Sequence, residues 1–161
     1  MTTASDTTSD TASDTADLDR AVRLHIYRAF LERGRPPSVA ATAAAVGREE
    51  EDVAAAFDRI AAGRVIVLER GTREIRMAPP LSAVPTRFTV RVDGRDYYGN
   101  CIWDALGVPA MLGRDAVITA RCGDCDAPLT LEVRGGALAR AEGVVHFAVP
   151  ARRWWDDIVF T

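Results

Sequence analysis

A change in hydrophobic periodicity near Pro79-Pro80 is the feature that most constrains how this 161-residue chain folds. Before it, apolar residues recur at helical spacing in three successive segments, and a short strand, a turn and a second strand follow. After it, most of the apolar residues alternate with polar ones, as in half-buried strands. Three helices and a hairpin are the pattern of a winged helix, so residues 17–78 are expected to form a winged-helix-like domain.

The boundaries of these elements follow from the spacing. We expect helices over about 17–33, 39–46 and 49–62, and strands over 65–68 and 73–77. The second and third helices would form the helix-turn-helix pair of the domain.

Residues 1–16 have a different composition. They are Thr, Ser, Asp and Ala, with no large apolar residue after Met1. Such a segment buries too little surface to offset the entropy of ordering it, so we expect a disordered acidic tail.

The second half is predicted to be a small mixed domain, and the chain as a whole to be of the α+β class. Residues 79–86, rich in proline, are expected to be a linker, and residues 87–161 a domain of antiparallel strands around a short helix. The expected helix spans 101–112, a further turn of helix follows Pro150, and strands are expected over 88–92, 96–98, 116–120, 129–133 and 144–149.

The charge of the third helix argues against DNA as a partner. Five carboxylates, against only Arg48 and Arg59, occupy this helix and its first flanking residue: Glu49, Glu50, Glu51, Asp52 and Asp58. Such a helix would repel phosphates. We also find neither a membrane-spanning apolar run nor a signal peptide, so we expect a cytoplasmic protein without a membrane partner.

Three cysteines in a chain without an export signal favour metal or thiol chemistry over disulfides. Cys122-x-x-Cys125 has no second pair, whereas zinc prefers four ligands. Cys101 and His146 would be needed to complete a zinc site. The motif alone leaves three interpretations open: a metal site, a redox or accessory soft-ligand pair, or small residues at a tight turn.

Cys101 and Asp104 are three residues apart, which places both side chains on one face of a helix. A position in the first helical turn would lower the pKa of the Cys101 thiol, so Cys101 is predicted to be the most reactive thiol. A thiolate beside a carboxylate would supply a soft nucleophile and a proton carrier. The spacing alone favours the other interpretation, a buried cysteine and an unrelated exposed aspartate.

The residues around this pair resemble the core of the alkylmercury lyase family. The resemblance lies in Tyr98-Gly99-Asn100-Cys101-Ile102-Trp103-Asp104-Ala105-Leu106 and in Pro109-Ala110-Met111-Leu112-Gly113-Arg114, which match the family's Cys-x-x-Asp and Pro-Ala-hydrophobic-hydrophobic-Gly pattern. Residues 117–133, with Cys122 and Ala127-Pro128, are similar to the family's next hairpin, and residues 17–78 to its N-terminal domain.

The resemblance implies protonolysis of a carbon–mercury bond, giving a hydrocarbon and thiolate-bound Hg(II). It implies that Cys101 is the first thiolate and Asp104 the proton carrier, with an organomercury compound and small thiols as partners and with no cofactor. Mercury is soft and prefers thiolates, so Cys101, Cys122 and Cys125 are the expected metal ligands, with zinc at Cys122 and Cys125 as a weaker alternative.

The resemblance also implies a second essential cysteine after the region similar to residues 146–161. Either the chain continues, or Cys122 or Cys125 substitutes, or the protein is a truncated, non-catalytic relative. We expect tight organomercury binding at Cys101, with slow or absent turnover by the 161 residues alone. The alternative from another class is a winged-helix regulator that senses metals or thiols through its cysteines.

Overall fold

The computed structural model describes the backbone of residues 7–159 and the side chains of residues 11–159. The chain divides into two compact units, residues 1–78 and 79–161. Both combine helices with antiparallel strands, so the fold is mixed α+β. Within the described part, no helix combines the length and apolarity needed to cross a membrane.

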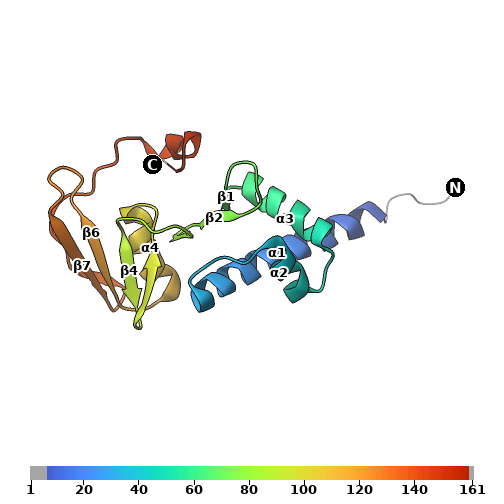
Figure 1. Ribbon diagram of the computed structural model, residues 1–161, viewed down its shortest axis with the longest axis horizontal. Coiled ribbons are helices and arrows are strands. Elements are labelled where there is room, and N and C mark those ends of the chain that lie inside the picture. The colour runs from blue at the N-terminus through green and yellow to red at the C-terminus, as the bar shows by residue number, and fades with distance from the viewer. Residues whose placement is uncertain (1–6, 160–161) are drawn as a thin grey trace. The chain divides into compact units, whose positions relative to one another are not determined.

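The first unit contains three helices and a hairpin (Figure 1). The helices are α1 (Thr7–Arg33), α2 (Val39–Val46) and α3 (Glu50–Ala62), and each contacts the other two. The hairpin pairs β1 (Val67–Leu68) with β2 (Ile75–Ala78) in antiparallel fashion. Every helix and strand expected in this region is therefore present, although the strands are shorter than the sequence suggested.

The helices assemble through the apolar stripes that the spacing predicted. In α1, Leu18, Val22 and Ile26 follow one another at intervals of four residues, and all are buried. Val53 and Phe57 of α3 are fully buried as well. Ser38 begins α2 by accepting a hydrogen bond from the Ala41 amide at 3.1 Å, and Gly47 ends it in the left-handed conformation.

The predicted disorder is wrong for residues 7–16, which form the first turns of α1. Residues 1–6 of the expected tail lie outside the described residues. A helix that is already anchored by Leu18 and Val22 extends at low cost, because only its nucleation is unfavourable. Local and tertiary hydrogen bonds add to this: Thr15 donates to the Thr11 carbonyl at 2.8 Å, and Asp14 accepts from Arg48.

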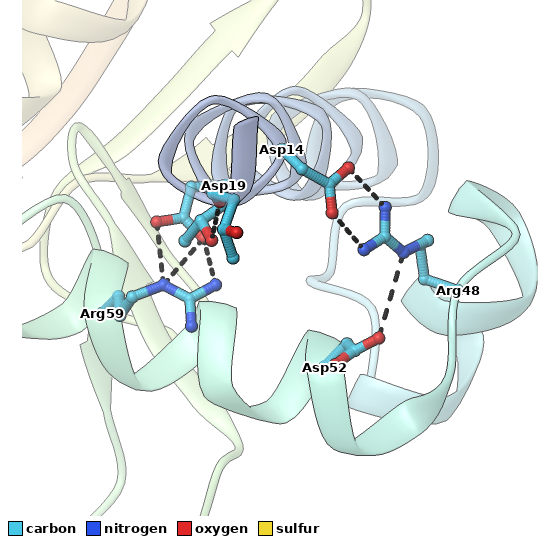
Figure 2. Close-up of polar contacts among 7 residues, drawn as sticks. Asp14, Asp19, Arg48, Asp52 and Arg59 are labelled. Carbon is cyan, nitrogen blue, oxygen red and sulfur yellow. Dashed lines mark hydrogen bonds and ion pairs between the residues drawn. The ribbon is translucent and has the colours of Figure 1, made fainter. Parts of the chain in front are cut away.

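Ion pairs join α1 to the start and the end of α3 (Figure 2). Arg48 donates to both oxygens of Asp14, at 3.1 and 2.9 Å, and lies 3.9 Å from Asp52. Arg59 donates to Asp19 at 2.7 Å. Exposed pairs of this kind contribute only about 0–1 kcal/mol each to stability. Their larger effect is on charge, because both arginines that accompany the acidic α3 face carboxylates of α1.

The second unit is built on a five-stranded antiparallel sheet with the order β5-β4-β6-β7-β8. Helix α4 lies between β5 and β6 in the chain and contacts β4 and β6 (Figure 1). The elements of this unit are β3 (Leu81–Ser82), β4 (Thr89–Val92), β5 (Arg95–Tyr98), α4 (Ile102–Leu112), β6 (Ala116–Arg121), β7 (Pro128–Arg134), β8 (Ala137–Arg140) and a 3-10 helix, η1 (Ala151–Asp156).

The core of this unit is formed by one face of the sheet and one stripe of α4. Val90, Ile118 and Leu131 stand opposite one another across β4, β6 and β7, and all three are buried. Ala105 and Val108 of α4 are fully buried. The alternation of buried and exposed residues along each strand thus fixes which face carries the helix.

Two expectations for this unit are wrong. Residues 79–86 are not a bare linker, because they contain β3, in which Leu81 and Ser82 are buried. Residues 144–149 do not form a strand; the strand that follows β7 is β8, since Gly135 and Gly136 adopt positive φ values and turn the chain back at once. His146, expected within an apolar strand, is consequently exposed.

Candidate active site

The site that the sequence predicted lies at the start of α4. The chain leaves β5 at Tyr98, and Cys101 is the N-cap of the helix, with extended backbone at φ −139° and ψ −176°. The Cys101 carbonyl accepts the first helical hydrogen bond, from the Ala105 amide at 2.9 Å. Asp104 falls in the first turn, where the positive end of the helix dipole favours a carboxylate.

Cys101 and Asp104 contact each other directly. The Cys101 thiol donates a hydrogen bond to Oδ2 of Asp104, with 3.6 Å between sulfur and oxygen. Both side chains are half-buried, because they border the stripe formed by Ala105 and Val108 that packs against the sheet. The structure therefore brings together the two residues that the spacing placed on one helical face.

Burial changes the acidity of both groups. It raises the pKa of the Cys101 thiol, which the backbone amides of Asp104 and Trp103 counter only in part. The pKa of Cys101 is thus shifted in the direction opposite to the one expected, because desolvation outweighs the hydrogen bonds from the backbone amides at the helix start. Burial also raises the pKa of the Asp104 carboxyl above its usual range, against opposing hydrogen bonds from Cys101 and Asn100. Both groups therefore retain a proton more readily than they would in water.

The raised pKa of Asp104 predicts a pH-dependent stability difference for Asp104→Asn. A carboxyl whose pKa is higher in the folded state stabilises that state when protonated, and this contribution is lost as the pH rises through the folded-state pKa. The amide stays neutral at every pH. The variant should therefore gain in melting temperature relative to the parent chain on going from pH 4 to pH 8, as measured by circular dichroism. A constant difference across this range would contradict the burial of a charge at Asp104.

Gly99 allows the end of β5 to approach α4 closely. A Cβ atom on Gly99 would lie 2.6 Å from the backbone nitrogen of Ala105 and 3.1 Å from the carbonyl carbon of Asp104. These are backbone atoms, which cannot move aside as a flexible side chain could. The absence of a side chain at Gly99 therefore sets the position of the helical turn that carries Asp104.

The C-terminal segment covers the flank of this turn. Asn100 donates to the Ile158 carbonyl at 3.2 Å, and the Trp154 ring lies 6.5 Å from Trp103 and 5.0 Å from Phe147 between ring centroids. Trp103, Phe147 and Trp154 contribute to an open hollow of ≈ 560 Å³. No signal in the sequence joined residues so far apart in the chain.

These aromatic residues are not a buried core. Trp154 and its neighbour Trp155 are only half-buried. Trp103 is 63% exposed. Trp103 follows Cys101 by two residues and precedes Asp104 by one, and side chains at these spacings point in different directions on a helix. The hollow that Trp103 lines is therefore on another flank of α4 than the Cys101–Asp104 pair.

The other two cysteines lie in the turn between β6 and β7, Cys122 half-buried and Cys125 exposed. Among the described residues, no three His, Cys, Asp or Glu side chains are grouped so that they could hold a metal ion. The three cysteines predicted as metal ligands therefore do not converge on one point. A four-ligand zinc site on this turn lacks its remaining ligands within the same described part.

The shifts in thiol pKa favour an order of reactivity different from the one that the sequence predicted. The backbone amides of Cys125 and Asp124 and the Cys125 thiol lower the pKa of Cys122, whereas burial raises that of Cys101. Limiting iodoacetamide at neutral pH should therefore label the Cys122–Cys125 turn before Cys101, as read by peptide mass spectrometry. If Cys101 were labelled before the other two cysteines, the prediction made from the sequence would be correct instead.

Comparison with known proteins gives a consistent result. The family model described as MerB, alkylmercury lyase, matches residues 81–161, the second unit of the chain almost in full. A protein named alkylmercury lyase from Pseudomonas putida is 31% identical over 118 residues, which make up 70% of this chain and 50% of that protein. A structure titled as the mercury-bound form of MerB2 has a similar fold, with a TM-score of 0.62 and 23% identity over 77% of this chain and 59% of its own.

The chain thus spans about half the length of the curated relative that it matches. The family model covers half of the chain and includes both residues of the Cys101–Asp104 pair. The alkylmercury lyases are a family of enzymes, and this chain belongs to that family.

Proposed function

We propose that this protein splits carbon–mercury bonds by protonolysis, with Cys101 as the thiolate that binds mercury and Asp104 as the group that carries the proton. The observation that carries the proposal is the 3.6 Å contact between the Cys101 sulfur and Oδ2 of Asp104. A thiol and a carboxyl that share a hydrogen bond can exchange a proton without moving apart. Membership of the alkylmercury lyase family supports the choice of substrate class.

The first step is capture of the substrate. The Cys101 sulfur forms a bond to the mercury of R–Hg–X, the Cys101 proton passes to the Asp104 carboxylate, and X leaves with its electron pair. Mercury favours this exchange because it is soft and prefers sulfur. The raised pKa of Asp104 matches the task, since the carboxyl must accept and hold this proton.

The second step breaks the carbon–mercury bond. A thiolate from a small thiol adds to mercury and increases its electron density, Asp104 donates its proton to the carbon, and the bonding electron pair stays on that carbon. The products are the hydrocarbon RH, ionised Asp104, and Hg(II) held between Cys101 and the small thiol. Atoms and charge balance, and no cofactor enters either step.

The test of the proposed function is hydrocarbon release from an arylmercury compound with the chain in excess and a small thiol present. We expect release that is slow but faster than with the thiol alone, and loss of this difference in Cys101→Ser. Gas chromatography of the hydrocarbon supplies the measurement. Undiminished release from Cys101→Ser, or no excess over the thiol control in the parent chain, would contradict the proposal.

For the first unit, we propose a winged-helix-like module without a DNA-binding role. Its three helices and hairpin support the assignment. Three arginines that would otherwise meet phosphates are paired with carboxylates: Arg48 with Asp14, Arg59 with Asp19 and Arg73 with Asp58. The charge on α3 thereby disfavours the alternative function of a transcriptional regulator.

The corresponding prediction concerns affinity for duplex DNA. At physiological salt we expect only weak and non-specific binding, because an acidic α3 releases no counterions from phosphates. Selection from a random duplex library, followed by gel-shift titration, is the measurement. Enrichment of one tightly bound sequence would contradict the prediction and favour a regulator.

A further inference from the structure

The turn between β6 and β7 carries two thiols that the proposed mechanism does not use. Cys122 and Cys125 stand at its two ends, Cys122 half-buried and Cys125 exposed. The turn is closed by backbone hydrogen bonds, from the Cys122 amide to the Ala127 carbonyl at 2.8 Å and from the Asp126 amide to the Cys122 carbonyl at 3.1 Å. Both sulfurs are therefore held on one short, hydrogen-bonded loop.

Ion pairs fix the far side of this loop. Asp126 adopts a positive φ of 57° and lies 2.8 Å from Arg121 and 3.2 Å from Arg87. Arg121 precedes the turn at the end of β6, and Arg87 precedes β4. The loop is thus held to the sheet at Asp126, immediately after Cys125.

The two cysteines are three residues apart on a loop that backbone hydrogen bonds close. The Cys125 thiol and the amides of Asp124 and Cys125 act on the Cys122 sulfur, and together they favour its ionised form. Two thiols held on one short loop are arranged for a cation that takes two sulfur ligands. A cation that requires four ligands lacks the other ligands here, because among the described residues no third His, Cys, Asp or Glu is grouped with the two cysteines.

We propose that Cys122 and Cys125 form a second, separate thiol site that binds a soft, two-coordinate cation between their sulfurs, and that Hg(II) is its occupant. Soft thiolate ligands select soft cations, and Hg(II) with two thiolates is complete in a nearly linear arrangement. The choice of Hg(II) rests on the proposed function, because that reaction leaves Hg(II) on Cys101 and one small thiol, from which a second small thiol can carry it to this loop. Binding itself requires no bond cleavage.

The binding step is an exchange of thiols. Hg(II) arrives with two small thiolates, two bonds form to Cys122 and Cys125, and the two departing thiolates take up the protons that the cysteines lose. No electron is transferred, so neither an oxidant nor a reductant is needed. Two sulfurs on one loop bind Hg(II) more tightly than two separate thiols do, because the second sulfur–mercury bond forms intramolecularly.

The experiment uses the reduced 161-residue chain and inorganic Hg(II) supplied as its glutathione complex, with glutathione in excess. We expect one Hg(II) per chain to be retained through gel filtration, with sulfur–mercury absorbance in the near ultraviolet. Cys122→Ser and Cys125→Ser should each weaken retention by roughly 10²–10⁴-fold, because the intramolecular second bond is lost. Asp96 pairs with Arg91 at 2.7 Å and belongs to neither thiol site, so Asp96→Asn is the matched control and should retain Hg(II) as the parent chain does.

Parallel samples with Cu(I) and Zn(II) test the selectivity, and we expect retention of a soft cation but not of Zn(II). Retention that survives replacement of both turn cysteines, or that disappears in Cys101→Ser, would overturn the proposal. So would preferential retention of Zn(II), or a Cys122–Cys125 disulfide that persists in excess glutathione. Melting curves of the variants verify that they are folded. The experiment supplies inorganic Hg(II), so it does not depend on carbon–mercury cleavage. A failure to retain Hg(II) and a failure to release hydrocarbon are therefore distinguished by separate measurements.

Discussion

Asp104→Asn is expected to abolish hydrocarbon release while leaving mercury bound at Cys101. Asparagine keeps the shape of the side chain and its carbonyl oxygen, but it neither accepts the Cys101 proton nor donates one to carbon. Proton delivery by a positioned group contributes typically 10²–10⁴-fold to a rate, so the loss should be of about that size. The Cys101 sulfur can still bind mercury, because in the variant its proton can pass to the departing group X or to water instead of to Asp104.

Separating cleavage from binding requires two measurements on the same variant. Hydrocarbon release reports the bond-breaking step. Binding at Cys101 is measured by peptide mass spectrometry, which locates the arylmercury adduct in the chain. Asp96→Asn is the matched control, since Asp96 is a carboxylate of the same unit that pairs with Arg91 at 2.7 Å, away from α4. Cleavage by Asp104→Asn at the rate of Asp96→Asn would show that another group delivers the proton.

Gly99→Ala is expected to have the second largest effect, on both stability and cleavage. The new Cβ would lie 2.6 Å from the Ala105 nitrogen, so β5 and the first turn of α4 must move apart. Overpacking of this kind costs about 1–3 kcal/mol of unfolding free energy. A displacement of Asp104 relative to the bound substrate by even a fraction of an ångström to 1 Å can reduce the rate by about 10²-fold.

Gly123→Ala is the control for this substitution. Gly123 does not have a positive φ, and a Cβ there would meet no atom within 4 Å, so its stability and hydrocarbon release should match those of the parent chain. Urea denaturation and the release assay provide the two readouts. If Gly99→Ala matched Gly123→Ala in both, the close approach between β5 and α4 would not position the site.

The elements that sequence patterns predicted well are those defined by local spacing. The stripe Leu18, Val22, Ile26 predicted α1, and the same logic placed Cys101 and Asp104 on one face of α4. Strands β6 and β7 followed from alternation on either side of Cys122 and Cys125. Such features depend on near neighbours in the chain, and these are visible in a sequence.

The features that could not be predicted depend on contacts between distant residues. The helical segment 7–16 is stabilised by the hydrogen bond from Arg48 to Asp14. The raised pKa of Cys101 comes from burial, which its position at the helix start did not reveal. The contact between Asn100 and the Ile158 carbonyl likewise joins segments with no shared motif. Composition described the first residues correctly as polar, but polarity did not decide their conformation.

The strand order of the second unit has a consequence for how the site comes into being during folding. Strands β4 and β5 close as a hairpin, and so do β6 and β7, but β4 meets β6 only across the whole of α4, with Thr89 opposite Thr119. Closing this longer loop costs more entropy than either hairpin, and pairings distant in sequence form slowly. Helix α4 contacts both β4 and β6, so we expect the Cys101 thiol to become partly shielded only after these two strands have paired. Protection of the Cys101 sulfur from a thiol reagent during refolding is therefore expected to report the pairing of β4 with β6.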